Sequence, residues 1–122
     1  MFAINEDLDA FVRHYSRNHY KEVSTTQIVI CENCSTNIFV AFVNDDDSVN
    51  LKCINCNKRY EIGVCGCTNY STKETKCNFC NREKFNIMHG TAYGEYNQNW
   101  EYVVGQCVKC QELLVVSNWH ST

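Results

Sequence analysis

Apolar side chains recur at intervals of three and four along the first twenty residues. This period is that of one helix face, and it predicts an amphipathic helix from Asn5 to about Tyr20. Asn5 is a suitable N-cap, acidic residues follow it, and basic residues gather near the other end, as the helix dipole favours. We expect the apolar face to pack on the rest of the fold rather than to act as a docking helix. Its members are Ile4, Leu8, Phe11, Val12 and Tyr15.

From residue 27 onward the apolar period changes to two, and the segments become short and rich in β-branched and aromatic residues. This pattern is typical of strands. Polar segments between them predict a turn at Asp45–Asp47, a loop at Cys67–Lys76, and a long hairpin tip that contains Gly90, Gly94 and Asn97–Asn99. The expected strands are Gln27–Ile30, Ile38–Val43, Val49–Lys52, Tyr60–Val64, Phe85–Met88, Trp100–Val104 and Leu113–Ser117.

Four C-x-x-C pairs punctuate this series of strands. Two residues between cysteines let a tight turn direct both sulfurs to one point, and a hairpin brings two such turns together. Four thiolates then surround a metal at roughly 2.3 Å, and soft sulfur ligands select zinc over magnesium or calcium. We therefore predict two Zn²⁺ ions. The pairs are Cys31 with Cys34, Cys53 with Cys56, Cys77 with Cys80, and Cys107 with Cys110.

The order of elements is the same in the two halves of the chain: pair, strand, turn, strand, pair, strand. It indicates an internal repeat with a period near fifty residues. The ligand pattern and hairpin layout resemble the zinc-ribbon superfamily, over about residues 27–64 and 75–117. That resemblance implies a small, metal-bound, β-rich α+β protein, with the N-terminal helix packed on two tandem zinc-ribbon-like units. The expected segments are 1–26 for the helix, 27–66 for the first ribbon and 67–122 for the second.

Zinc ribbons often carry glycine after the second cysteine of a pair, where the backbone is left-handed. Asparagine is the next best residue for this conformation, so Asn57 and Asn81 fit the pattern. Ser35 and Gln111, which stand at the other two positions, fit it less well.

Cys65 and Cys67 fall outside the four pairs. They are alternative ligands, because a site made of Cys65, Cys67, Cys77 and Cys80 would leave the last pair unused. We prefer the symmetric assignment, since a C-x-C chelate is less usual in closed zinc sites. The two extra cysteines are otherwise free thiols in the core or a redox-active pair.

The first ten residues include three acidic and no basic side chains, and no long apolar run is present. This composition is unlike a secretory signal, and no segment approaches the length of a membrane span. We therefore expect a cytoplasmic, reducing environment in which paired cysteines bind metal rather than form disulfides.

The formal net charge is −3, which disfavours general binding to polyanions. Residues 52–85 nevertheless carry seven basic and three acidic side chains, with aromatic residues between them. Cations interleaved with aromatics are typical of single-strand nucleic-acid binding. Because the total charge is negative, we prefer the interpretation that these cations offset thiolate charge while the aromatics pack the hairpins. The candidate contacts are Lys58, Arg59, Lys73, Lys76, Arg82 and Lys84.

Sulfur-only zinc sites leave no open coordination position, and the chain has no H-E-x-x-H or phosphate-loop motif. We therefore expect no enzyme activity and no small-molecule substrate. Acidic ends, strand edges and aromatics such as Trp100 favour recognition of a protein partner, for instance by an inhibitor or immunity-type protein. The alternatives are a nucleic-acid-binding or transcription-associated factor, and a thiol redox sensor or electron carrier.

Overall fold

The computed structural model describes residues 5–63, 72–96 and 98–121. The described part is β-rich with one N-terminal helix, as the sequence predicts. In that part, no helix is long and apolar enough to cross a membrane. The elements are α1 (Glu6–His19), β1 (Thr25–Ile28), β2 (Phe39–Asn44), β3 (Val49–Cys53), β4 (Arg59–Ile62), β5 (Thr72–Glu74), β6 (Phe85–Tyr93), β7 (Asn99–Cys107) and β8 (Leu113–Ser121).

Helix α1 begins and ends close to the predicted positions. The side-chain oxygen of Asn5 accepts a hydrogen bond from the backbone N–H of Leu8 at 2.9 Å, which satisfies one unpaired donor at the helix start. The same side chain donates to Gln106 Oε1 on β7 at 2.8 Å. Leu8 and Val12 are fully buried. The predicted apolar face therefore does pack on the fold. One of its five predicted members, Ile4, lies outside the described residues.

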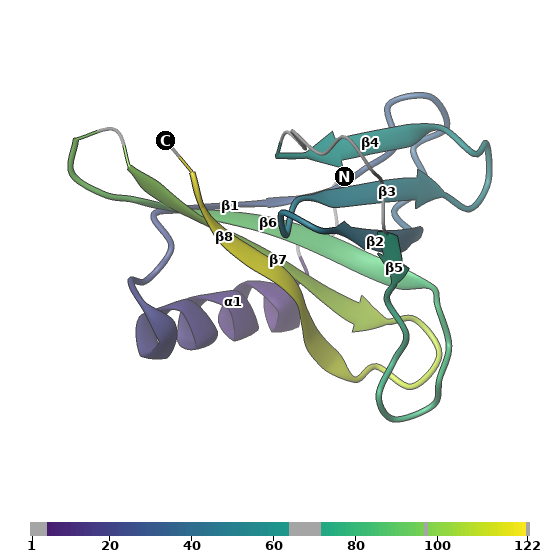
Figure 1. Cartoon of the computed structure of the whole chain (residues 1–122). Helices are drawn as coiled ribbons and strands as arrows, with labels where there is room; N and C mark the ends of the chain where they lie inside the picture. Colours follow the sequence, from purple (N-terminus) through teal and green to yellow (C-terminus); the bar gives the residue numbers. More distant parts are fainter. Residues whose placement is uncertain (1–4, 64–71, 97, 122) are drawn as a thin grey trace.

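The eight strands of the described part belong to one sheet, in which β4-β3-β2-β6-β7-β8 are consecutive neighbours. Strand β1 adds to β6, and β5 adds to β2. The sheet folds on itself so that β2, β3 and β4 lie over one face of β6, β7 and β8, while α1 covers the other face (Figure 1). The β6–β8 layer is thus the middle of three layers.

Two hydrophobic cores separate these layers. One lies between the two strand layers and includes Phe39, Leu51, Phe85 and Ile87. The other lies between α1 and the middle layer, where Tyr102 is its largest fully buried side chain. Because alternate residues of β6 point to opposite faces, Ile87 enters the first core and Met88 the second.

The predicted loop at Cys67–Lys76 is wrong in its second part, where β5 forms. Residues 67–71 lie outside the described residues. The three residues of β5 are polar, so they carry no apolar signal. They are held instead by antiparallel pairing with β2, in which Glu74 is opposite Phe42. Strand β1 pairs similarly with β6 and begins two residues before the predicted start at Gln27.

The predicted hairpin tip is too long, because β6 runs through Gly90 and ends at Tyr93. Gly90 is a packing position rather than a turn residue. A Cβ atom there would lie 2.8 Å from Val23 Cγ1 and 3.2 Å from Val12 Cγ2. Helix α1 and the segment after it therefore approach β6 closely because residue 90 lacks a side chain.

The repeat seen in the sequence extends to the strand pairings. We call β1–β4 the first half and β5–β8 the second half. Ile28 ends β1 three residues before Cys31, and Glu74 ends β5 three residues before Cys77. Each half then forms the same three-stranded meander, β2-β3-β4 or β6-β7-β8.

The two halves exchange their leading strands. Ile28 of β1 pairs with Met88 in the second half, and Glu74 of β5 pairs with Phe42 at the equivalent place in the first. Phe39 pairs with Phe85, its own equivalent. These reciprocal pairings are the arrangement of an isologous dimer, with a local two-fold relation centred on this pair of phenylalanines.

Further contacts join the first half to β8, at the turn between β2 and β3 and at Gly63 after β4. Ser117 Oγ donates to the carbonyl oxygen of Asp47 at 2.6 Å. Gly63 lies so close to Trp119 that an added Cβ would be 2.9 Å from its Cζ2. In the turn itself, Asp46 Oδ1 accepts hydrogen bonds from the backbone and the hydroxyl of Ser48. This carboxylate therefore shapes the turn.

Candidate metal centres

Four cysteines of the first half form what we call the first cluster. Cys31 and Cys34 lie in the turn between β1 and β2, Cys53 ends β3, and Cys56 precedes β4. The Cys31 and Cys56 sulfurs are 3.5 Å apart, as are those of Cys34 and Cys53. These separations exceed the roughly 2.05 Å of a disulfide by far. The cluster is thus a set of free thiols directed at a common point.

The second cluster repeats this arrangement in the second half. It consists of Cys77 and Cys80 between β5 and β6, and Cys107 and Cys110 between β7 and β8. The Cys77 and Cys110 sulfurs are 3.5 Å apart, and so are those of Cys80 and Cys107. The structure therefore brings the last two pairs together. Cys65 and Cys67, the alternative ligands, lie outside the described residues.

Both clusters have the dimensions of a tetrahedral zinc site. Within each cluster all four sulfurs lie within 4.8 Å of one another. Metal–sulfur bonds of roughly 2.3 Å require sulfur–sulfur edges of about 3.8 Å in a regular tetrahedron. This confirms the prediction of two four-cysteine groups, each positioned to hold one of two Zn²⁺ ions.

The four C-x-x-C turns share one backbone geometry. In each, the residue after the second cysteine donates its N–H to the carbonyl oxygen of the first cysteine, at 2.8 to 3.0 Å. That residue has a left-handed backbone in every turn, including those of Ser35 and Gln111, whose φ angles are 62° and 67°. The ligand geometry thus imposes this conformation even where the side chain makes it costly.

Neighbouring polar groups favour the thiolate form in the first cluster. The hydroxyl of Thr36 lies 3.1 Å from Cys34 Sγ. Hydrogen bonds from the side chains of Thr36 and Asn55 lower the pKa of Cys34 to about 5. Tyr60 donates its hydroxyl to Cys31 Sγ at 3.2 Å, and this bond is the main cause of the lowered pKa of Cys31. Sequence reasoning missed these three donors, because no motif marks a threonine, asparagine or tyrosine that supports a ligand.

The second cluster receives its support from backbone groups. The backbone N–H of Cys80 is the main cause that lowers the pKa of Cys77, to about 7. At Cys110 the Glu112 N–H favours the thiolate, but burial and the other three sulfurs outweigh it and raise the pKa to about 12. Four thiolates this close repel one another, so a divalent cation between them is the natural counter-charge. The donor set therefore fits Zn²⁺.

We predict that the second cluster releases its metal at a higher pH than the first. A lowered thiol pKa stabilises the deprotonated, metal-competent state, and this stabilisation is lost as the pH falls through the folded-state value. That value is about 5 for Cys34 but about 7 for Cys77. In an acid titration of the zinc-loaded chain, the amide NMR signal of Asn81 should therefore change before that of Asn57. Simultaneous loss, or the reverse order, would contradict this.

The candidate nucleic-acid contacts do not form one continuous basic surface. Lys76 pairs with Glu74 at 2.6 Å and with Glu83 at 4.0 Å. Lys58 lies over the ring of Tyr60, and Arg59 over that of Phe42. The others are divided between β5 and the second cluster: Lys73 is on β5, while Arg82 and Lys84 line a hollow with Lys109.

Comparison with known proteins finds no matching family model, no similar curated protein and no similar solved structure. The chain's own geometry is therefore the basis for assigning a function.

Proposed function

We propose that this chain is a non-catalytic, zinc-stabilised module that recognises a protein partner. In this proposal each half is a zinc ribbon, and the two ions maintain the fold rather than take part in a reaction. Sulfur-only, four-ligand zinc sites are closed, whereas catalytic sites usually keep a position for water or substrate. Among the described residues, neither cluster includes a histidine or carboxylate ligand.

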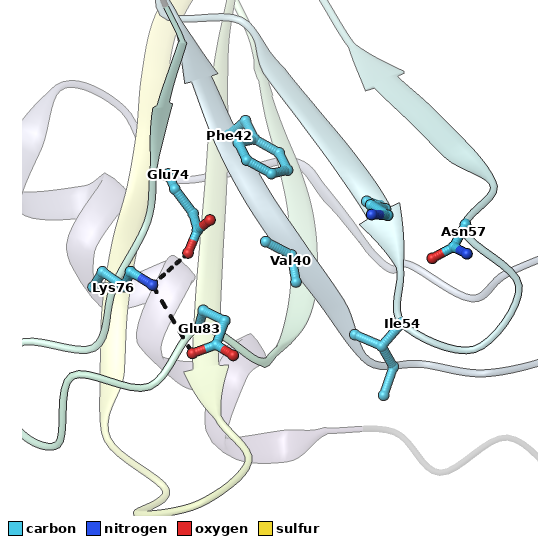
Figure 2. A pocket seen from close by; sticks show the side chains of 8 residues that line it. Val40, Phe42, Ile54, Asn57, Glu74, Lys76 and Glu83 are labelled. Carbon is cyan, nitrogen blue, oxygen red and sulfur yellow. Dashed lines mark ion pairs between the residues drawn. The ribbon is translucent and has the colours of Figure 1, made fainter.

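The observation that carries the proposal is an uncovered sheet surface in the first half, which we call the open face. It is the side of β2 and β3 that points away from the core between the layers (Figure 2). Val40 and Phe42 stand at its centre, and Ile54 is 36% exposed beside them. A shallow hollow of about 440 Å³ lies here, lined by Val40, Phe42, Lys52, Ile54, Asn57, Glu74, Lys76 and Glu83.

An apolar centre with a charged rim is the usual composition of a protein-binding surface. The aromatic ring of Phe42 offers a large contact area, and the charged residues around it can select a partner through complementary charge. The open face therefore supports protein recognition better than it supports binding of a nucleic-acid backbone, which requires a surplus of cations.

A matched pair of variants tests the proposal. Ile54→Glu puts a charge on the open face, while Tyr96→Glu changes a side chain that is 91% exposed at the distant β6–β7 hairpin. When tagged chains are purified from their own host, we expect one protein to co-purify in stoichiometric amount. Ile54→Glu should reduce its recovery about tenfold, as loss of a central contact does, and Tyr96→Glu should leave it unchanged.

Two outcomes would contradict protein recognition by this surface. One is that no protein co-purifies with the unaltered chain. The other is that Ile54→Glu retains the partner as well as Tyr96→Glu does. Recovery of nucleic acid that is lost after Arg82→Glu with Lys84→Glu would instead favour the nucleic-acid alternative. Zinc content must match in all variants, so that an effect on the surface is not confused with unfolding.

A further inference from the structure

The exchange of leading strands makes the two halves comparable residue by residue. The Phe42–Glu74 pair in the first half corresponds to the Met88–Ile28 pair in the second. The open face around Phe42 is therefore equivalent to the outer face of β6 and β7 around Met88. The two surfaces have the same backbone construction, so they can be compared by what covers each.

In the second half this surface is covered by an amphipathic helix. Leu8 and Val12 of α1 pack on Met88, Val104 and their neighbours and exclude water from them. In the first half, nothing among the described residues covers the equivalent surface, and both Val40 and Phe42 remain partly exposed. One three-stranded meander is thus covered by a helix of this chain, while residues 5–63, 72–96 and 98–121 supply no helix to its counterpart.

Around Phe42 the open face is more polar than its covered equivalent, whereas Val40 stands where the second half has Asn86. Strand pairing places Asn50 where the second half has Val104, and Arg59 where it has Leu113. These changes keep an apolar centre at Phe42 but make the surrounding surface compatible with water. A surface of this kind suits a partner that binds and leaves, whereas the covered face suits a helix that stays.

The two sides of the open face differ in charge, with more carboxylates on the β5 side and more cations on the β3–β4 side. On the β5 side, Lys76 lies between Glu74 and Glu83 (Figure 2). On the β3–β4 side, Lys52 is paired across the strands with Arg59, and Glu61, opposite Asn50, adds one carboxylate to these two cations. In the part of the chain that the structure describes, neither of these two cations forms an ion pair. The Arg59 guanidinium donates to Asn50 Oδ1 at 3.4 Å and lies 5.6 Å from the centre of the Phe42 ring.

We propose that the open face binds an amphipathic helix of a partner protein, positioned as α1 is on the second half. The helix would place apolar residues on Phe42, as α1 does on the equivalent Met88, and on the neighbouring Val40, with an acidic flank beside Lys52 and Arg59. The six residues of β2 span about 20 Å, which a helix of about thirteen residues matches. This inference rests on the proposed function and names the partner's chemistry.

Two synthetic peptides of 14 residues, the length of α1, test the inference on the full zinc-loaded chain. Both carry an apolar stripe at helical spacing; one has glutamates along the flank, and its twin has lysines at the same positions. We expect the acidic peptide to bind about tenfold more tightly than its twin, as two ion pairs allow. Its amide NMR shift changes should cluster at Val40, Phe42 and Asn50.

Charge reversal supplies the decisive variant. Lys52→Glu combined with Arg59→Glu should invert the preference between the two peptides, while Lys109→Glu, on the distant second cluster, should leave it unchanged. The inference is overturned if neither peptide binds, if the shift changes gather elsewhere, or if the double variant keeps the original preference. Self-association of the chain that Ile54→Glu abolishes would also overturn it, because the occupant would then be a second copy.

The co-purification experiment and the peptide-binding experiment can fail independently, so their outcomes distinguish the two proposals. Loss of the co-purified protein in Ile54→Glu, together with failure of both peptides, would leave protein recognition standing and reject a helical partner. Peptide binding without any co-purified protein would reject the proposed function. The surface would then bind a helix in a purified mixture but would have no protein partner in its own host.

Discussion

Replacing Cys53 by serine is expected to remove the metal from the first cluster and to abolish cooperative unfolding near the original temperature. Cys53 is fully buried, and it ends the strand that leads into the cluster. Structural zinc sites contribute about 10–16 kcal/mol of apparent binding free energy, while whole domains are stable by only about 5–15 kcal/mol. Native mass spectrometry should report a fall from two zinc ions to one, and the melting temperature should fall by about 20 °C or more.

A double substitution, Cys65→Ser with Cys67→Ser, is the matched control for this prediction. Both zinc ions should remain, because eight other cysteines already form the two clusters. Loss of an ion in the double variant would instead make one of these two cysteines a ligand. If a chelator removed both ions without altering the far-UV spectrum or the melting curve, zinc would have no structural role.

Truncating Phe85 to alanine is expected to cost about 3–5 kcal/mol of folding stability while leaving both zinc ions bound. Phe85 is fully buried and forms the backbone pair with Phe39 that joins β2 to β6. The cavity would therefore open where the two halves meet. Thermal unfolding should show a melting temperature lower by about 12–20 °C.

Phe79→Ala gives a comparison with the same change of side chain at the surface. Phe79 is 78% exposed between two ligands of the second cluster. Its truncation should change stability by less than about 0.5 kcal/mol. Equal effects of the two substitutions, or loss of zinc from Phe85→Ala alone, would contradict the role assigned to the junction.

Local patterns were sufficient to predict α1 and the grouping of the cysteines. The helix is indicated by a sustained apolar period and by an N-cap at Asn5. Both signals depend only on residues close together in the sequence. The clusters depend on turns whose shape is set by the cysteine spacing, which is why Ser35 and Gln111 adopt the left-handed conformation despite their side chains. Features that depend on neighbours in sequence could thus be predicted.

Strand partners could not be predicted in the same way. Strand β5 has no apolar residue to reveal it, and its pairing with β2 depends on how the two halves meet. Glycine usually indicates a turn. Gly90, however, lies within β6, where its missing side chain lets Val12 and Val23 pack closely against the strand. Alternation along a strand predicts which side faces a core, but it does not say which other strand lies beside it.

The exchange of leading strands sets an order in which this protein can be completed during synthesis. The four thiols of the first cluster have all left the ribosome once residue 56 and the tunnel-length segment behind it have been translated. Strand β1 and helix α1 must still wait for β6 and β7. The nascent chain therefore can take up one metal ion early, while its amino-terminal segment stays unpaired until β6 and β7 have also left the ribosome.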